Sequence, residues 1–366
     1  MLKMLVCAAD IAERRTVHKG AADYFIASNN DLQPGKSLKK APVVWRVLFL
    51  IFATVCGLYM FFVCGRQINI HMRSRYVLLR QLLDKGSCQN PVTKSAEYVP
   101  LHYPIPKTYT RDECACTAVH LFAILSMQRS GSGWFETLLN SHPNISSHGE
   151  IFSVKERRQN FSTISQTLDT VYNLDWFSSA SKNECTAAVG LKWMLNQGAM
   201  EYNREVVEYF KKRGVSVILL FRRNILRRLI SVLANAYDRS AKQLNGTHKS
   251  HVHSKQEAVL LAAYKPLINV TFLQTNLQRI EEVTDDAVKF FKSTRHMILY
   301  YEDLIKDQMM REVEEFLKVP PHKLESRQVK IHTLPLSEQI ENRDEVYKKL
   351  KGTKYEVFME ETDYDM

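Results

Sequence analysis

The chain has 366 residues, of which 45% are hydrophobic and 24% are charged, and seven are cysteines. This composition excludes collagen-like, wholly disordered and small disulfide-stapled proteins. Fifty Lys and Arg residues against 39 Asp and Glu give a net charge of +11, which suits an anionic ligand, a nucleic acid or an acidic membrane surface without choosing among them. The cysteines lack C-x-x-C spacing, so no structural zinc site is expected.

An uncharged apolar stretch covers residues 47–65, between Arg46 and Arg66. A helix needs about 20 apolar residues to cross a bilayer, so this stretch predicts a transmembrane helix that serves as a signal anchor. It begins well inside the chain and no small-x-small cleavage site follows it closely, which disfavours a cleaved signal peptide. The alternative is a buried core helix, a class that seldom stays uncharged for so long.

The orientation of this anchor is predicted from glycosylation sequons. The basic residues on its two flanks are nearly balanced, so the positive-inside rule adds little. All four Asn-x-Ser/Thr sequons follow the stretch: they start at Asn144, Asn160, Asn245 and Asn269. This favours a C-terminal part in the secretory lumen, and the occupancy of each sequon stays open.

We therefore expect a single-pass type II membrane protein. Its predicted parts are a cytoplasmic tail (1–46), the anchor (47–65), a stem (66–116) and a luminal domain (117–366). In the oxidising lumen Cys88 could pair with Cys114, Cys116 or Cys185, and the sequence leaves the connectivity open.

From residue 117 onward, apolar runs of strand length alternate with longer amphipathic stretches. Strands are expected over residues 118–125, 187–194, 215–221 and 296–301. Helices are expected over residues 133–141, 198–213, 224–237, 255–292 with breaks around Pro266, and 304–317. Continuous apolar strands between helices are buried on both faces, which predicts a central parallel sheet in a three-layer α/β/α domain.

The first predicted strand runs into a loop of small residues that opens a helix. The loop consists of Arg129, Ser130, Gly131, Ser132, Gly133 and Trp134. Small residues at a strand-to-helix turn let backbone N–H groups converge on an anion, and the helix N-terminus adds a partial positive charge. The loop therefore predicts a phosphate site, with an ordinary Gly/Ser turn as the alternative. It lacks the Lys-Ser/Thr pair of a Walker A loop, which disfavours an ATP-dependent kinase.

A second candidate anion site follows the strand predicted over residues 215–221. Arg223 lies just beyond this strand, at the end where open α/β sheets bind ligands. Ser231 comes eight residues later, about two helical turns on and on a similar face. An Arg and a hydroxyl so placed can bind one more phosphate group, whereas Arg227 and Arg228 are interpreted as a solvated helix face.

Three segments, residues 128–152, 219–231 and 299–304, resemble the sulfotransferase superfamily. Its members transfer a sulfuryl group from 3′-phosphoadenosine 5′-phosphosulfate (PAPS). The resemblance extends roughly over residues 119–339. It looks most like the membrane-bound branches, the tyrosylprotein sulfotransferases and the trehalose or nodulation-factor carbohydrate sulfotransferases. It implies a P-loop-like fold and PAPS as co-substrate, with no metal.

The resemblance also implies roles for individual residues. In the membrane-bound branches a glutamate after the loop helix is the catalytic base, and Glu150 stands at that position here. Arg129 and the backbone N–H groups of residues 130–134 would bind the 5′-phosphosulfate, and Arg223 and Ser231 the 3′-phosphate. Lys330, in a short match at residues 326–330, would stabilise charge on the bridging oxygen, so Glu150, Arg129 and Lys330 are the expected catalytic residues.

Together these features predict a Golgi sulfotransferase that acts on a hydroxyl of a carbohydrate or of a secreted peptide. The expected partners are the acceptor and the membrane, with a homodimer as an option and no nucleic acid. One alternative is a type II Golgi glycosyltransferase, although such enzymes use an internal D-x-D and the one here is residues 363–365. The other is a non-catalytic nucleotide-binding membrane protein. His248, His251 and His253 have metal-ligand spacing but are interpreted as part of a flexible loop.

Overall fold

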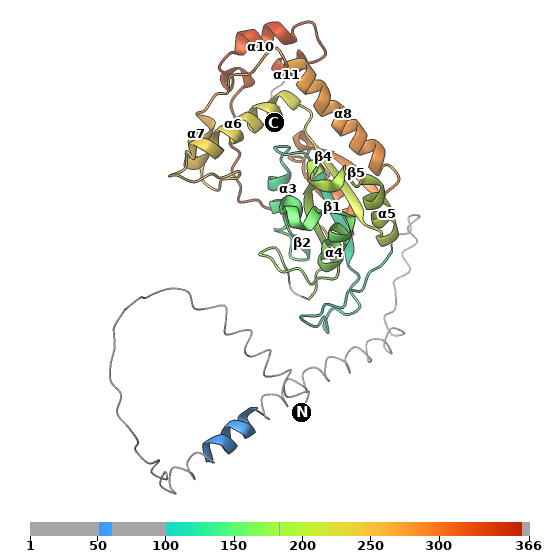
Figure 1. Ribbon diagram of the computed structural model, residues 1–366. Helices are drawn as coiled ribbons and strands as arrows, with labels where there is room; N and C mark the ends of the chain where they lie inside the picture. Colours follow the sequence, from blue (N-terminus) through green and yellow to red (C-terminus); the bar gives the residue numbers. More distant parts are fainter. Residues whose placement is uncertain (1–50, 61–99, 183, 361–366) are drawn as a thin grey trace, which may run out of the picture. The chain divides into compact units, whose positions relative to one another are not determined.

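The computed structural model describes residues 51–60, 100–182 and 184–360. The chain divides into two compact units, Met1–Val92 and Thr93–Met366. In the first unit residues 51–60 form an exposed helix (Figure 1), and the rest of the predicted anchor, 47–50 and 61–65, lies outside the described residues. None of the helices in the described residues has the length and apolarity needed to cross a membrane.

The second unit is built on a parallel sheet, as the sequence predicts. Its strands in the described residues are β1 (His120–Ser126), β2 (Ile145–Ser147), β3 (Ala188–Met194), β4 (Ser216–Phe221) and β5 (His296–Tyr300), arranged in the order β2-β3-β1-β4-β5. Each neighbouring pair is parallel. Because Ser126 pairs with both Met194 and Leu220, the three central strands end at the same edge, which positions the site described below.

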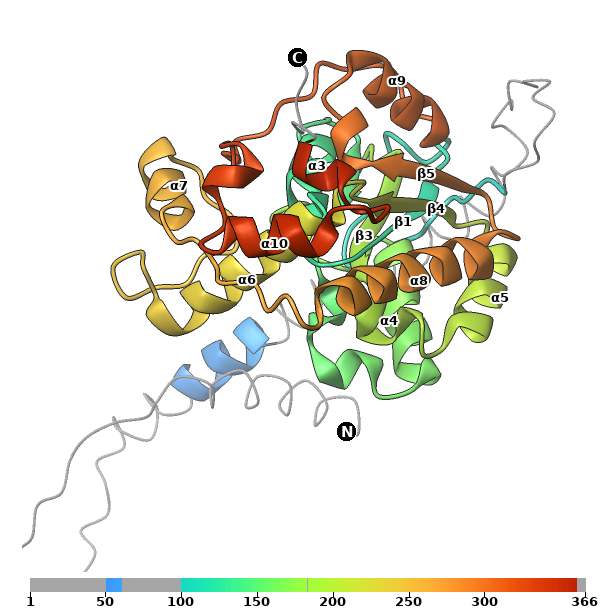
Figure 2. The same cartoon turned by 90° about the horizontal axis from the view of Figure 1, so that it is seen from above.

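One face of the sheet is covered by three helices, α4 (Phe161–Tyr172), α5 (Asn203–Arg213) and α8 (Leu273–Phe291) (Figure 2). Leu168, Phe210 and Phe291 from these helices share one buried cluster with alternate strand residues such as Leu191 and Leu219. Alternation along a strand sends every second side chain to this face.

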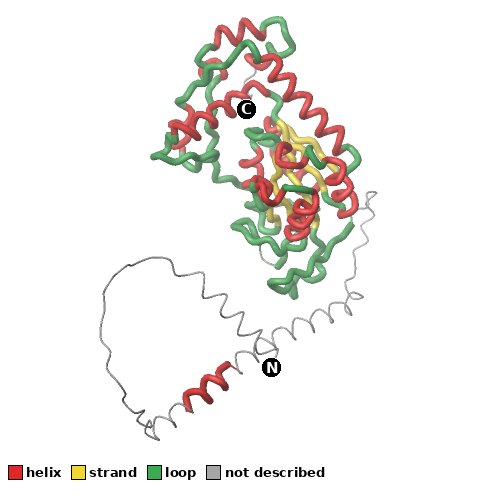
Figure 3. The backbone as a smooth tube through the Cα atoms, viewed as in Figure 1, coloured by secondary structure: helices red, strands yellow, loops and turns green. Residues whose placement is uncertain are grey.

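The opposite face is covered by α3 (Ser132–Leu139) and α9 (Asp307–Phe316). Phe135 and Val313 from these helices pack with Phe122 and Ile124 of β1, the strand residues that alternate with those on the first face. The strands therefore form a middle layer between two helical layers (Figure 3), which confirms the predicted α/β fold with its central parallel sheet.

A helical region lies beyond the carboxyl edge of the sheet. It contains α6 (Ile225–Ala241), α7 (Lys255–Ala262), α10 (Arg343–Leu350) and α11 (Val357–Glu360). Leu226, Leu277 and Val346 join α6, the start of α8 and α10 in one buried cluster. The predicted break around Pro266 is confirmed, because α7 and α8 are separate helices.

The remaining elements are short. The 3-10 turns cover Ile151–Ser153, Lys155–Arg158, Tyr301–Asp303 and Leu336–Glu338, and a π turn covers Leu195–Ala199 before α5. Residues 100–116, predicted as the end of the stem, contact the domain: buried Arg111 donates to the carbonyls of Glu184 and Thr186. Cys114 forms a disulfide with Cys185, and Cys116 is disulfide-bonded as well.

Candidate active site

A cavity of about 420 Å³ lies at the carboxyl edge of the sheet. Its wall combines the loop after β1, the end of β3, one side of α6 and two segments around residues 250 and 330. The lining residues with reactive or charged side chains include Arg129, Glu150, Lys192, Arg222, Ser231, His251, Lys330 and His332. Open parallel sheets bind ligands at this edge, and the volume is typical of small-molecule sites.

The loop after β1 has the geometry that the sequence predicts for an anion site. Gly131 has a φ of +82° and forms the N-cap of α3, after a left-handed Arg129 with a φ of 64°. A Cβ on Gly131 would lie 2.1 Å from the ring of Tyr301, and one on Gly133 would lie 2.4 Å from the ring of His251. Both positions thus require glycine, and the backbone N–H groups at the start of α3 stay close to the cavity.

Arg129 connects the two predicted anion sites, the loop after β1 and the one that contains Ser231 on α6. Its Nε donates a hydrogen bond to Ser231 Oγ at 2.9 Å, and its Nη1 donates to the carbonyl of Ser250 at 2.7 Å. Burial, with the neighbouring Arg222 charge as a second cause, lowers the pKa of Arg129 to about 10, which leaves the guanidinium protonated at neutral pH. Arg129 and Ser231, 102 residues apart, therefore lie on one cavity wall.

The two arginines after β4 lie in different surroundings. Arg222 lines the cavity, with its guanidinium 5.1 Å from the centre of the Tyr301 ring and 3.8 Å from Glu302. Arg223, the residue predicted to bind the 3′-phosphate, is not among the described residues that line the cavity. Its side chain is 47% exposed and pairs with Asp303 at 2.5 Å, a hydrogen bond that raises the pKa of Arg223.

The prediction of a solvated face for Arg227 and Arg228 is wrong. Arg228 is half-buried, and desolvation is the main cause that lowers its pKa to about 10. Arg227 is buried, with 5% of its surface exposed, and its Nη1 donates to the carbonyl of Leu334 at 3.2 Å. Its backbone N–H is capped by Asn224 Oδ1. The first turn of α6 is therefore buried beneath the segment that contains Leu334.

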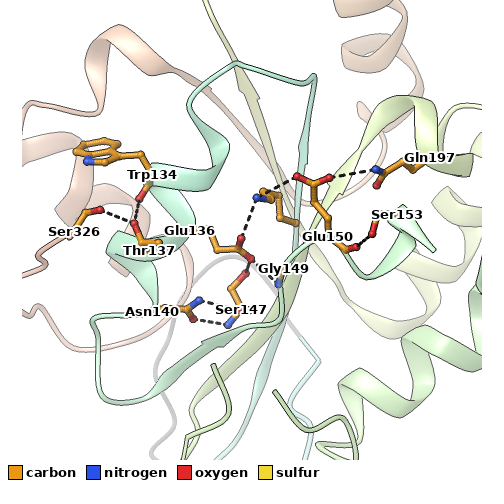
Figure 4. A network of polar contacts seen from close by, with 11 residues as sticks. Trp134, Glu136, Thr137, Asn140, Ser147, Gly149, Glu150, Ser153, Gln197 and Ser326 are labelled. Carbon is orange, nitrogen blue, oxygen red and sulfur yellow. Dashed lines mark hydrogen bonds and ion pairs between the residues drawn. The ribbon is translucent and has the colours of Figure 1, made fainter. Parts of the chain in front are cut away.

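Glu150 belongs to a charged network that the sequence did not predict (Figure 4). Lys192 Nζ, on β3, lies 3.3 Å from Glu150 Oε1 and 3.3 Å from Glu136 Oε2 on α3. Gln197 Nε2 donates to the second oxygen of Glu150 at 3.3 Å. The Glu150 side chain is 35% exposed, whereas Lys192 is 7% exposed, so the carboxylate reaches the cavity with a buried lysine behind it.

Glu136 fixes the turn that carries Glu150. Its Oε1 accepts hydrogen bonds from Ser147 Oγ at 2.7 Å and from the backbone N–H of Gly149 at 2.8 Å (Figure 4). Glu136 thus contacts both Lys192 and the residue that precedes Glu150. Buried carboxylates with several donors hold their position well, because each lost contact would leave a charge unpaired.

Two segments cover the cavity. Val252 and Val329 form an antiparallel bridge, with Val329 N–H bonded to the Val252 carbonyl at 2.9 Å. The bridge places His251 beside the cavity on one segment, and Lys330 and His332 on the other. Lys330 Nζ lies 6.0 Å from the Tyr301 ring centre.

Residues 248–253 form a loop, as the sequence predicts, and this loop has several contacts with other elements. His248 Nδ1 pairs with Asp238 at 2.5 Å, Ser250 accepts from Arg129, and Val252 is fully buried. A local reading of the polar residues missed these contacts because their partners lie on other elements.

The charge of the cavity favours an anion. Among its described lining residues five are Lys or Arg and one is acidic: Arg129, Lys192, Arg222, Arg239 and Lys330 against Glu150. Desolvation, helped by neighbouring cations, lowers the pKa of both His251 and His332 to about 4, so both are neutral at pH 7. A multiply charged anion would relieve this concentration of positive charge.

The described residues contain no group of three or more His, Cys, Asp or Glu side chains arranged to hold a metal ion. Residues 363–365, the D-x-D sequence, lie outside the described residues.

Sequence reasoning missed Lys192, Arg222, His251 and His332 as cavity residues. The one available signal was Lys192, a charge within the otherwise apolar strand over residues 187–194. A lysine in a strand buried on both faces is costly unless it is paired, so its presence points to a carboxylate partner.

Comparison with known proteins finds a relative by sequence. The chain is 25% identical over 251 residues to Nodulation protein H of Rhizobium meliloti, a match that covers 65% of this chain and 94% of that protein. A crystal structure of a sulfotransferase from Alicyclobacillus acidocaldarius is 12% identical, covers 66% of this chain and 96% of its own, and has a TM-score of 0.35. No family model matches the chain.

The name of the sequence relative corresponds to the nodulation-factor branch that the motifs resemble. The match covers nearly all of that protein, and the loop, Ser231 and Glu150 lie on one cavity in this chain. The chain is therefore similar to Nodulation protein H over most of its second unit, and the residues that carry the predicted resemblance to the sulfotransferase superfamily lie around one cavity.

Proposed function

We propose that the protein transfers a sulfuryl group from PAPS to a hydroxyl of an acceptor molecule. The observation that carries the proposal is the cavity itself, in which the glycine loop, Ser231 and the Glu150–Lys192 pair face one space lined by five cationic side chains. Sulfuryl transfer needs positioning, fixed positive charge and a base, and little covalent help from the protein.

The donor would bind along the loop and the first turns of α6. In this proposal the N–H groups of residues 130–134 and the guanidinium of Arg129 bind the 5′-phosphosulfate. Ser231 Oγ, 2.9 Å from Arg129 Nε, contacts the 3′-phosphate. Arg222 is the arginine that lines the cavity, so it is the nearer candidate for the same phosphate, and Arg223 would have to leave Asp303 to reach it.

The acceptor would approach Glu150. The Glu150 carboxylate takes the proton of the acceptor hydroxyl while the hydroxyl oxygen forms a bond to sulfur. The bond between sulfur and the bridging phosphate oxygen breaks, and 3′-phosphoadenosine 5′-phosphate (PAP) leaves. Lys192 and Lys330, both on the cavity wall, would stabilise the negative charge that builds up on the sulfuryl and bridging oxygens.

The cellular setting is a further part of the proposal. A luminal, membrane-anchored enzyme of the Golgi is supported by the apolar stretch at residues 47–65 and by the disulfide between Cys114 and Cys185, because structural disulfides persist in oxidising compartments. The acceptor is a carbohydrate or a tyrosine of a secreted peptide, and both kinds of hydroxyl suit a glutamate base.

The test is calorimetric titration of the full chain, in a mild detergent, with PAP and with ADP in the absence of added metal. We expect binding in about the micromolar range that prefers PAP, and a loss of that preference in Ser231→Ala. No binding of PAP, or a preference for ADP with Mg²⁺, would overturn the proposal. Transfer of a radiolabelled sulfuryl group to oligosaccharides and to tyrosine peptides then separates the two acceptor classes.

A further inference from the structure

We propose that His251 is a donor-binding residue, whose imidazole takes up a proton when the phosphosulfate binds and then donates hydrogen bonds to its anionic oxygens. This inference deepens the proposed function and rests on it. Residue 251 belongs to none of the three segments that resemble known sulfotransferases.

The position of the imidazole is the first argument. His251 lines the cavity, and its ring lies directly against Gly133 in the first turn of α3, since a Cβ there would come within 2.4 Å of it. This is the helix end that offers N–H groups to an anion. The ring therefore lies beside the place where the 5′-phosphosulfate would bind.

The second argument is that the backbone around His251 is held in place. Arg129, from the glycine loop, donates to the carbonyl of Ser250, the preceding residue. Val252, the following residue, is fully buried and paired with Val329. The backbone of His251 is thus held on both sides, and one of the residues that hold it, Arg129, is itself a predicted donor ligand.

The third argument is the charge around the ring. The charged and titratable groups that face His251 are Arg129 from the loop, Lys192 from β3 and His253 from its own segment. Glu150 lines the same cavity but is paired with Lys192. Although His251 as a whole residue is exposed, its ring lies against Gly133, and desolvation together with these cations lowers its pKa to about 4, so the ring is neutral without donor.

Binding of the donor would favour the protonated form of the His251 ring. An opposite charge within hydrogen-bond distance favours the charged form of an imidazole, and charge-assisted hydrogen bonds to phosphate oxygens are the strong ones. The pKa of His251 is therefore expected to be higher with donor than without it. Complex formation then takes up a proton, so this contribution to affinity is present at low pH and is lost as pH rises through the pKa of the complex.

The experiment measures proton uptake on binding of PAP to the full chain in detergent. Calorimetry at neutral pH in two buffers of different ionisation enthalpy gives the number of protons taken up. The variants are His251→Gln, His251→Lys and, as a matched control, His322→Gln, which changes an exposed imidazole that is not among the described residues lining the cavity. Free PAP enters every titration in the same protonation state, so the difference in proton uptake between wild type and His251→Gln reports the contribution of the histidine.

We expect wild type and His322→Gln to behave alike. His251→Gln should take up fewer protons and bind PAP about tenfold more weakly, the scale of one lost charge-assisted hydrogen bond. His251→Lys should keep much of the affinity, because it supplies a permanent positive charge, and should take up as few protons as His251→Gln. A purely structural histidine would not give this pattern.

Several outcomes would overturn the inference. Equal proton uptake and equal affinity in wild type and His251→Gln would exclude His251 as a donor-binding residue and leave the proposed function intact. Failure of wild type to bind PAP would overturn both this inference and the proposed function. If the variants do not fold, the histidines of wild type can be acylated with diethylpyrocarbonate and the modified residues mapped by mass spectrometry. PAP should protect His251 and leave His253 reactive. Unchanged reactivity of His251 would contradict its contact with donor.

Discussion

Lys192 Nζ lies 3.3 Å from Glu150 Oε1, with Glu136 Oε2 at the same distance on its other side. The lysine is buried in the sheet, whereas Glu150 is partly open to the cavity. A buried cation thus aims the predicted base at the ligand space, and Glu136 keeps that cation and the turn before Glu150 in place.

Replacing Lys192 should damage both activity and stability. We expect Lys192→Met to reduce transfer about 10²-fold, because it removes a positive charge near the reacting group and frees Glu150. It should also lower the free energy of unfolding by about 3 kcal/mol, since Glu136 would be left as an unpaired buried charge. Steady-state kinetics and urea unfolding measure the two effects. Lys155→Met, at an exposed position, is the control, and wild-type behaviour of Lys192→Met would exclude a role for the network.

Removing the charge of Glu150 should separate chemistry from donor binding. Glu150→Gln keeps the size of the side chain but cannot accept the acceptor proton, so we expect transfer to fall about 10²-fold or more. The affinity for PAP should stay near the wild-type value. Kinetics with saturating PAPS and calorimetry with PAP test this, with Glu156→Gln, an exposed neighbour, as control. Undiminished turnover in Glu150→Gln would remove Glu150 as the base.

The structure and the sequence resemblance favour different arginines as the 3′-phosphate ligand, Arg222 and Arg223 respectively. Because Arg222 lines the cavity and Arg223 is paired with Asp303, we expect Arg222→Ala to lower the affinity for PAP about tenfold or more. Arg223→Ala should have the smaller effect. Calorimetry on both variants checks the order. The reverse order would mean that Arg223 leaves Asp303 on binding and is the 3′-phosphate ligand that the resemblance implies.

Gly133 and His251 should be coupled in stability. A methyl group on Gly133 would approach the His251 ring to 2.4 Å, so we expect Gly133→Ala to cost about 1–3 kcal/mol, the scale of overpacking. In Gly133→Ala with His251→Ala the steric conflict is gone and most of this loss should return. Thermal unfolding of the single and double variants gives the coupling. Additive losses would show that the two residues do not share the space.

Glycosylation of the four sequons should follow their surroundings. Asn144 Nδ2 donates to the carbonyl of Cys185 at 2.9 Å, which leaves the amide engaged inside the fold, whereas Asn160, Asn245 and Asn269 are exposed. If the domain is luminal, we expect glycans at exposed sequons and none at Asn144. Glycosidase treatment followed by peptide mass spectrometry tests this. An occupied Asn144 would contradict the packing, and no glycan at any site would weaken the luminal assignment.

Local sequence patterns sufficed for most of the fold. The four predicted strands are present because long apolar runs mark strands buried on both faces, and the glycine loop before α3 is recognisable because its conformation depends on adjacent residues. Strand β2 was missed because its three residues are too few to show a period. Its pairing with β3, a contact between distant segments, defines it instead.

What the sequence by itself determined is therefore the parallel α/β architecture, the loop and the position of Ser231, which depend on short-range patterns, whereas Glu150 was indicated by the family resemblance alone. Only the tertiary structure decided which neighbours meet. The register of β3 against β1 brings Lys192 between two glutamates, the end of β4 sends Arg222 rather than Arg223 to the cavity, and the bridge between Val252 and Val329 holds His251 over Gly133. These contacts join residues far apart in the chain, and they are fixed by packing, which no local pattern encodes.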